Sequence, residues 1–240
     1  MGHPRSGQQA TTHVAKILRE AIRAGEMAPG HRLVELDLAE QLDVTRAAVR
    51  AALLDLTGEG LVERIANRGA RVRVIPLEEA LQIVECRAVL EGLCAARAAE
   101  RVRDEDRTLL RELGEKMRAA VAAGEVMAYS RLNQQLHAHV LRLSGQQVAS
   151  GLLERLNAQI VRHQFRLSLR PGRPQTSLPE HLALIEAVCS GDAGAAERAA
   201  RNHLASVAEA LRRSTESTES TASEQQGKKL RRSTDSTESE

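Results

Sequence analysis

The spacing of apolar residues predicts an N-terminal unit of three helices followed by a β-hairpin. Apolar side chains recur every three to four positions along three short stretches, as expected for amphipathic helices. The period then changes to two, in two strands that flank the turn Asn67-Arg68-Gly69. Three helices and a hairpin form the outline of a winged helix-turn-helix, which we assign to residues 11–76. The predicted helices begin near residues 11, 36 and 45, and the predicted strands cover 61–65 and 71–74.

After Pro76 the pattern is helical almost to the end, which predicts a mainly α protein whose second domain, residues 77–213, is an all-helical antiparallel bundle. Ser177 and Glu180 have the spacing of a capping box for a helix that starts near Pro179. The predicted helices are 77–101, 104–122, 126–143, 147–168, 178–190 and 193–212. Residues 1–10 are expected to be flexible, and the Ser-, Thr- and Glu-rich residues 214–240 are expected to be disordered.

Composition narrows the class of protein. The core is built from Leu, Ala and Val with only one Tyr and one Phe, which suits stacked helices. No apolar run approaches the roughly 18 residues of a membrane span, and the first nine residues are polar, so we expect a soluble, cytoplasmic protein. Three cysteines without CxxC spacing are expected to be small core residues. These are Cys86, Cys94 and Cys189.

Charge placement is more informative than the net charge of +2. The stretch from Arg64 to Arg73 contains four arginines and no acid, so it can follow a phosphate backbone. The third predicted helix carries Arg46 and Arg50 on the face opposite its apolar residues, and Thr45 is placed to cap its start. These features predict contact with nucleic acid.

The N-terminal unit resembles the GntR family of bacterial transcription regulators. The resemblance covers about 45 residues and departs from the family pattern at Ala48 and Ala51, where Pro and Glu are frequent. The matching positions are Gly25, Pro29-Gly30, Leu33, Glu35, Leu38-Ala39, Leu42, Val44-Thr45-Arg46, Val49-Arg50, Ala52-Leu53, Leu56, Glu59-Gly60-Leu61-Val62 and Arg68-Gly69.

The resemblance implies which residues touch DNA. The third helix would enter the major groove of a double-stranded operator with its N-terminal turn first, where arginine reads guanine through two parallel hydrogen bonds. A wing tip at Arg68 and Gly69 would enter the minor groove. Arg71 and Arg73 either add to this surface or are only the polar side of an edge strand. The implied helix contacts are Thr45, Arg46, Ala47 and Arg50.

The helical half resembles the FCD effector domain of the FadR branch of this family. The resemblance covers residues 77–212 and implies a cavity whose floor holds a divalent metal. It rests on Glu85-x-Arg87-x-x-x-Glu91, Asn133-x-x-x-His137, Glu180-His181 and His203. The implied metal ligands are Asn133, His137, His181 and His203.

Spacing supports this site independently. Asn133 and His137 are four residues apart, so both can meet one ion from one helix face, and His203 lies on an apolar stripe. Asn133 stands where Asp is usual, which removes the anionic ligand and weakens metal binding. Three nitrogen ligands favour zinc or nickel. Alternatively the pocket is metal-free, and His137, His181 and His203 bind the effector directly.

Arg87 is expected to point inward, because it shares a helix face with apolar residues. A buried arginine needs an anionic partner. That partner is either Glu91, one turn later, or the carboxylate of a small organic-acid effector. The two interpretations are compatible if the effector competes for the guanidinium.

The sequence therefore predicts a homodimeric transcription regulator that binds a pseudo-palindromic operator. It is expected to be a repressor whose effector comes from organic or aromatic acid catabolism. A ligand-independent architectural DNA binder is one alternative, and a metal-dependent hydrolase is another. The hydrolase is disfavoured because no nucleophile motif, HExxH or Gly-rich phosphate loop is present, so we expect no enzyme activity.

Overall fold

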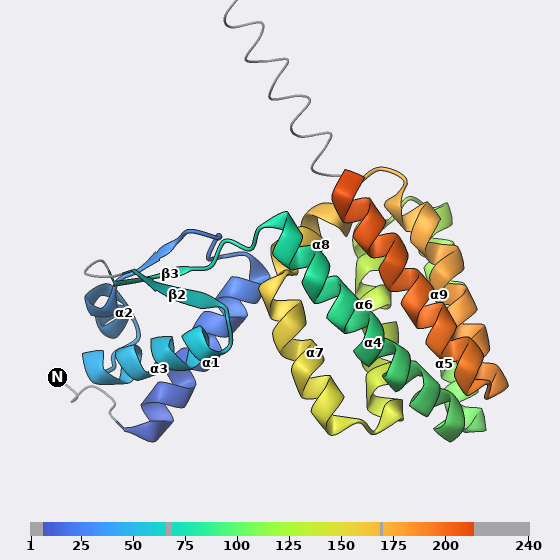
Figure 1. Cartoon of the computed structure of the whole chain (residues 1–240), viewed down its shortest axis with the longest axis horizontal. Helices are drawn as coiled ribbons and strands as arrows, with labels where there is room; N and C mark the ends of the chain where they lie inside the picture. The colour runs from blue at the N-terminus through green and yellow to red at the C-terminus, as the bar shows by residue number, and fades with distance from the viewer. Residues whose placement is uncertain (1–6, 66–68, 169, 214–240) are drawn as a thin grey trace, which may run out of the picture. The chain divides into compact units, whose positions relative to one another are not determined.

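The computed structural model describes residues 7–65, 69–168 and 170–213, which are mostly helical with one small sheet (Figure 1). The predicted mainly α fold is confirmed. Backbone packing divides the chain into two compact units. The first consists of Met1–Ile83 and Gly145–Arg166, and the second consists of Val84–Ser144 and Leu167–Glu240.

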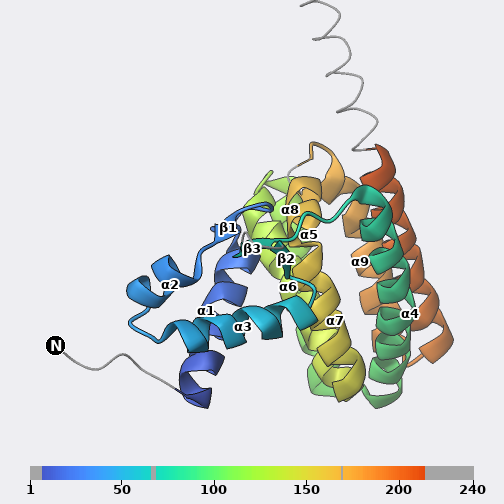
Figure 2. The same ribbon diagram turned by 60° about the vertical axis from the view of Figure 1, so that its left-hand side comes forward.

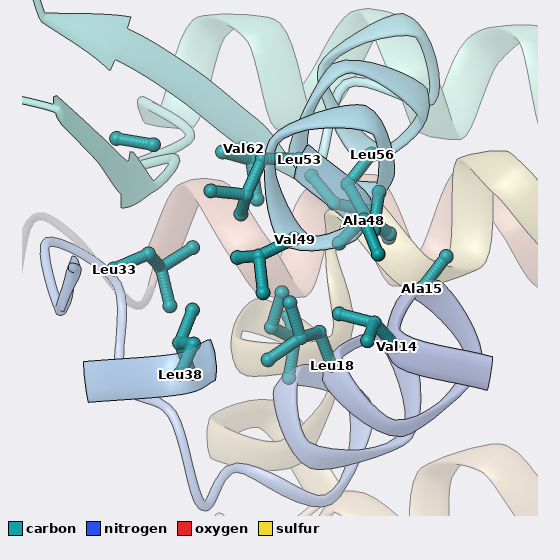
Figure 3. Close-up of a cluster of buried hydrophobic side chains, with 14 of the residues drawn as sticks. Val14, Ala15, Leu18, Leu33, Leu38, Ala48, Val49, Leu53, Leu56 and Val62 are labelled. Atoms are coloured by element: carbon teal, nitrogen blue, oxygen red, sulfur yellow. The ribbon is translucent and has the colours of Figure 1, made fainter. Parts of the chain in front are cut away.

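Three helices form the helix-turn-helix of the first unit: α1 (Gln8–Ala24), α2 (Glu35–Gln41) and α3 (Arg46–Gly58). Both α1 and α2 pack against α3, as Figures 1 and 2 show. The apolar faces predicted from the sequence meet in one core beneath the sheet (Figure 3). That core includes Val14, Leu18, Leu33, Leu38, Val49, Leu53, Leu56 and Val62.

The first helix starts earlier than predicted. It begins at Gln8, so residues 8–10, expected to be flexible, are helical, and Ala10 is buried. It ends at Ala24 and is capped by Gly25, whose φ of 80° lies in the left-handed region that glycine adopts without a side-chain clash. Residues 1–6 and 214–240, the rest of the expected flexible ends, lie outside the described residues.

The hairpin belongs to a three-stranded antiparallel sheet in the order β1-β3-β2. The strands are β1 (Arg32–Leu33), β2 (Val62–Ile65) and β3 (Gly69–Val72). Two residues are too few for an alternating pattern, so sequence reasoning missed β1. Because β3 pairs with a strand on each side, the interpretation of Arg71 as the polar side of an edge strand is wrong. The predicted turn residues Asn67 and Arg68 lie outside the described ranges.

The tight turn between α2 and α3 depends on Asp43 and Thr45. Asp43 has a φ of 51°, which is left-handed and uncommon for a residue other than glycine. Thr45 then adopts an extended conformation, and its Oγ1 accepts the backbone N–H of Ala48 at 3.3 Å. The predicted N-cap is confirmed, and it fixes where the third helix begins.

The second unit is a helical bundle. In it α5 packs against both α6 and α9, and α6 also packs against α9. Its helices are α4 (Leu77–Arg101, whose first turns belong to the other unit), α5 (Asp104–Ala122), α6 (Val126–Ser144), α9 (Arg173–Ser190) and a final helical segment over 193–213. No helix in these ranges is long and apolar enough to cross a bilayer. Cys94 and Cys189 are buried as expected, but Cys86 is exposed, so its assignment to the core was wrong.

Two boundaries in this half differ from the prediction. Helix α9 begins at Arg173, after Gly172 with a φ of 80°, and carries Pro174 in its first turn. Ser177 therefore lies inside the helix, where its hydroxyl donates to the carbonyl of Arg173 at 3.0 Å. The predicted capping box of Ser177 and Glu180 is wrong, because a proline at position 179 resembled a helix start and is instead accommodated within the helix.

The helix predicted over 147–168 is two helices, α7 (Gln147–Gln159) and α8 (Val161–Ser168), which meet at Ile160. Ala158 of α7 contributes to the core of the helix-turn-helix. The side-chain Nε2 of Gln159 donates to the carbonyl of Glu59 at 2.8 Å, just beyond the end of α3. This part of the helical half therefore packs against the N-terminal fold.

Candidate DNA interface and histidine cluster

The first turns of α3 present the residues predicted to contact DNA. The Thr45 cap satisfies a free backbone N–H at the start of the helix. Arg46, Ala47 and Arg50 are exposed, whereas Ala48 on the opposite face is buried. The helix thus buries its apolar side and leaves two guanidinium groups and a methyl group for a groove.

Both arginines lie close to a single carboxylate that the sequence analysis did not single out as a partner. Arg50 contacts Glu35, at the start of α2, through Nε (3.1 Å to Oε1) and Nη2 (2.7 Å to Oε2). Arg46 Nη2 lies 4.0 Å from the same Oε2. The hydrogen bond from Arg50 lowers the pKa of Glu35, with smaller contributions from the charges of Arg46 and Arg64. Glu35 is therefore anionic near neutral pH.

Arg71 and Arg73, the two wing arginines whose role the sequence leaves open, are already paired. Arg71 Nε donates to Glu63 at 2.6 Å on the neighbouring strand. Arg73 Nη2 lies 2.9 Å from Glu79, and its Nη1 donates to the carbonyl of Gly60 at 3.3 Å. Gly69, the described half of the predicted wing tip, starts β3 with a φ of 88°. Arg68 lies outside the described residues.

Three of the predicted metal ligands come together in the second unit. One nitrogen each of His137, His181 and His203 can be chosen so that all three lie within 4.8 Å of one another. The ring centroids are 4.4 Å apart for His181 and His203, 5.4 Å for His137 and His181, and 5.5 Å for His137 and His203. They belong to α6, α9 and the segment 193–213, so three separate helices build the cluster.

The Nδ1 atom of each histidine has a partner outside the cluster. His203 Nδ1 lies 2.8 Å from Glu180 and His137 Nδ1 lies 3.4 Å from Glu91. His181 Nδ1 lies 2.8 Å from the hydroxyl of Tyr129. A partner on one ring nitrogen fixes the tautomer and orientation of a histidine, and it leaves Nε2 for a ligand.

His181 Nε2 in the cluster and Asn133 Oδ1 on α6 are buried and have no hydrogen-bond partner among the described residues. Asn133 lies one turn before His137 on α6. A buried polar atom without a partner is costly, and a metal ion bound by the histidines would satisfy His181 Nε2. Three imidazole nitrogens and one amide oxygen make a chemically reasonable donor set for a divalent metal.

Burial keeps the inner histidines neutral. Burial lowers the pKa of His181 well below its usual value, and the nearby His203 and His137 lower it further. Burial also lowers the pKa of His203, partly opposed by its hydrogen bond with Glu180. A neutral imidazole can bind a metal without first losing a proton. Burial raises the pKa of Tyr129 to about 12, so its hydroxyl remains protonated.

Arg87 connects to the same cluster through Glu91. Its Nε and Nη2 donate to Glu91 Oε1 at 3.0 and 2.7 Å, and both side chains are 9% exposed. Burial alone would raise the pKa of Glu91, but Arg87 and His137 hold it well below its usual range. The predicted inward orientation of Arg87 is present, and Arg87 Nη1 is buried without a partner among the described groups.

A cavity of about 10 Å³ lies beside Glu91 and His137 and is otherwise lined by apolar side chains. It is about the size of one water molecule, so an organic acid would enter it only if neighbouring side chains moved. A larger, open depression of about 500 Å³ follows the polar surface of α5, but its lining comes from that single helix and includes none of the histidines.

Sequence reasoning missed several partners of these groups. Glu35 and Glu180 occur in the family motifs, but their spacing along the chain does not reveal the partner of either carboxylate. The spacing of Ser177 and Glu180 predicts a helix cap, whereas in the structure Glu180 contacts His203. Arg173, which lies 3.5 Å from Glu180, carried no sequence signal, because it precedes the predicted start of its helix.

Comparison with known proteins agrees with this arrangement. The family model "Bacterial regulatory proteins, gntR family" matches residues 10–72, and the FCD domain model matches residues 82–206. The chain is 26% identical over 205 residues to the HTH-type transcriptional repressor RspR of Escherichia coli, covering 85% of this chain and 90% of the relative. It is 28% identical to the HTH-type transcriptional regulator LutR of Bacillus subtilis, covering 79% and 95%.

Solved structures show the same fold. E. coli McbR/YncC superposes with a TM-score of 0.70 at 22% identity, covering 86% of this chain and 98% of the other. A GntR regulator from Rhodococcus sp. RHA1 gives a TM-score of 0.64 at 26% identity, covering 85% and 98%.

A capped helix carrying exposed arginines, backed by a small sheet and joined to a helical domain, defines a DNA-binding transcription regulator. The chain belongs to the GntR family and carries an FCD domain. The matched families and relatives are transcription regulators and not enzymes.

Proposed function

We propose that this chain is a repressor that releases a double-stranded operator when a small organic acid binds its helical domain. One relative is named a transcriptional repressor, which supports this direction of control. The observation that carries DNA reading is the Thr45-capped start of α3, with Arg46 and Arg50 exposed. Operator DNA lies in the cytoplasm of a bacterium, so we place the protein there.

The first experiment is titration of the protein onto duplex DNA from upstream of its own gene, in the presence of excess competitor DNA. Arg46→Ala should weaken the complex by about 1–3 kcal/mol, because an arginine lost from a base edge removes a bidentate contact. Arg118→Ala removes the same charge from an exposed position on α5 and should change little. If both variants lose the same DNA affinity, or if modest salt abolishes binding of the wild type, the protein contacts only the DNA phosphates.

We propose that Arg87, His137, His181 and His203 bind the effector. The unpartnered Nη1 of Arg87 is a free donor for a carboxylate, and the Nε side of its guanidinium is already oriented by Glu91. Because the cavity there is about 10 Å³, effector binding requires the site to expand. A ligand that favours the expanded arrangement can shift the population of the whole protein.

The packing of α7 suggests how such a change reaches DNA. The chain passes between its two units after Ile83, after Ser144 and after Arg166. Between the last two crossings, α7 supplies Gln159 to the carbonyl of Glu59, beyond the end of α3. Glu59 in turn accepts a bidentate pair from Arg19 of α1. A shift of α7 would therefore act on the end of α3 and, through Glu59 and Arg19, on α1.

We propose zinc or nickel as the metal, held by His137, His181, His203 and Asn133. When bound, the metal would supply positive charge for an effector carboxylate. Chelator-treated protein should gain thermal stability on addition of zinc or nickel, and His203→Ala should lose this gain. Asn133→Asp should bind the metal more tightly, since it restores an anionic oxygen. An unchanged melting temperature in both the wild type and Asn133→Asp would favour the metal-free pocket.

We also propose a homodimer, since a pseudo-palindromic operator is read by a two-fold symmetric protein. Sedimentation of the free protein and of its operator complex would test the stoichiometry. An architectural DNA binder has no need for a buried cluster of polar groups in its helical domain. Stabilisation of the protein by an organic acid, but not by sodium chloride of equal ionic strength, would argue against that alternative.

A further inference from the structure

Helix α3 is linked to α2 by an ion pair between Arg50 and the acidic residue Glu35, for which none of the roles above gives a reason. Glu35 is the first residue of α2 and follows β1 by two positions. Its side chain is 17% exposed, whereas those of Arg50 and Arg46 are 55% and 61% exposed. An acid beside the arginines proposed to contact DNA opposes DNA binding through its charge, so its position requires a reason.

The geometry of the pair supplies that reason. Both carboxylate oxygens of Glu35 lie within 3.2 Å of Arg50 Nε, and Oε2 also lies 2.7 Å from Nη2. Glu35 therefore occupies the Nε side of the guanidinium. Arginine has five N–H donors, and the two of Nη1 and one of Nη2 remain on the other side. That remaining side is the fork that can bind O6 and N7 of a guanine.

We propose that Glu35 is a positioning residue that orients Arg50 for a base edge and limits contact with phosphates, and thereby sets the sequence specificity of the DNA complex. The carboxylate and the base can hold the guanidinium at the same time, because they use different N–H groups. Arg50 would pay less conformational entropy on binding the correct base, since its side chain is already fixed. Arg46 and Arg64 face the same charge, so Glu35 also reduces the net positive charge of α3 and β2.

A purely structural role for Glu35 is the main alternative. An acid in the first turn of a helix is stabilising, and Val34 provides no side-chain cap for α2. A structural role would change stability and would alter specific and non-specific binding together. A positioning role changes the ratio between them.

The test uses the full chain and the duplex that the wild type selects most strongly from a random pool, beside a scrambled duplex of equal composition. Glu35→Gln should bind the scrambled duplex more tightly, and its ratio of specific to non-specific affinity should fall about tenfold. The salt dependence of its non-specific binding should be steeper by about one released ion. Asp37→Asn, in the same turn of α2, removes the same charge without an ion pair among the described residues and should leave the ratio unchanged.

Two further variants separate orientation from charge and from folding. Glu35→Asp keeps the charge but shortens the side chain, so the ratio should fall while the salt dependence stays that of the wild type. In an Arg50→Ala background, Glu35→Gln should lower the ratio much less, because only its effect on the charge around Arg46 and Arg64 remains. An unchanged ratio in Glu35→Gln, or an equal fall in the Arg50→Ala background, would overturn the proposal. Failure of the wild type to select any sequence would overturn both this proposal and the proposed operator binding.

Discussion

Two arginine–glutamate pairs in this protein have the same chemistry and opposite surroundings. Arg50 and Glu35 meet at 2.7 Å on the surface of the DNA-reading unit, and Arg87 and Glu91 meet at 2.7 Å inside the helical bundle. The arginine of the first pair is 55% exposed, whereas both members of the second are 9% exposed. Solvent screens the first pair and allows it to exchange partners. The second has no water to replace a lost partner.

The difference indicates how each pair is used. A surface pair can orient a side chain for an incoming ligand while adding little to stability. In a buried pair each member is needed for stability, because removing one leaves the other as a buried charge without a partner. Three measurements would break or sharpen this contrast.

The largest effect is expected inside the bundle. Glu91→Ala should lower the free energy of unfolding by about 3–5 kcal/mol, because Arg87 would keep a buried charge without its partner. Chemical denaturation monitored by circular dichroism would measure it. The control is Glu100→Ala, which removes an exposed pair with Arg97 from the same helix and should cause no measurable change. The double variant Arg87→Met/Glu91→Leu should recover most of the stability. An unstable double variant would mean that the volume of the side chains matters more than their charge.

A smaller effect is expected from acid. His181 and His203 have lowered pKa values in the folded protein, whereas unfolded histidine titrates near 6.5. Below that pH the unfolded state binds more protons than the folded state, so stability falls as the pH drops from 7.5 to 5.5. Urea midpoints of metal-free protein at pH 7.5, 6.5 and 5.5 would show the slope, and His181→Gln should have a shallower one. The pair of Glu35 and Arg50 should not contribute in this window, since the pKa of Glu35 is lowered from about 4.5.

The smallest effect is expected at the surface pair. Glu35→Ala should lower the urea midpoint only slightly, because the guanidinium of Arg50 is 55% exposed and remains in water. Urea denaturation monitored by circular dichroism, in the buffer used for Glu91→Ala, would measure the change. A clear loss of stability in Glu35→Ala would show that the pair anchors α2, and it would erase the contrast between the two sites.

The sequence predicted the helix-turn-helix well because each of its signals is local. A Thr at position 45 followed by an amphipathic helix, and a glycine at position 25, specify their ends through neighbouring backbone groups alone. The strand β1 was missed because it is stabilised only by pairing with β3, which is distant in sequence. The start of α9 was misplaced because Pro179 is tolerated inside a helix whose ends are set elsewhere.

The two candidate sites differ in the same way. The inward direction of the three histidines followed from helical spacing and a family resemblance, and the structure brings them together. Their partners Glu91, Glu180 and Tyr129 could not be assigned from spacing, since each contact joins different helices. The pairing of Glu35 with Arg50 likewise spans 15 residues and two helices.

The position of α7 has a consequence for anyone who wishes to divide or recombine this protein. A fragment that ends at Pro76 contains every residue of the helix-turn-helix, yet it lacks Ala158 from the core and the amide of Gln159 from the carbonyl of Glu59. Such a fragment would expose an apolar surface that the intact chain covers. A chimaera that takes its helical domain from another regulator would likewise need a replacement for α7 that fits this helix-turn-helix. The helical domain and the helix-turn-helix would then have to be exchanged, and to evolve, as a matched pair.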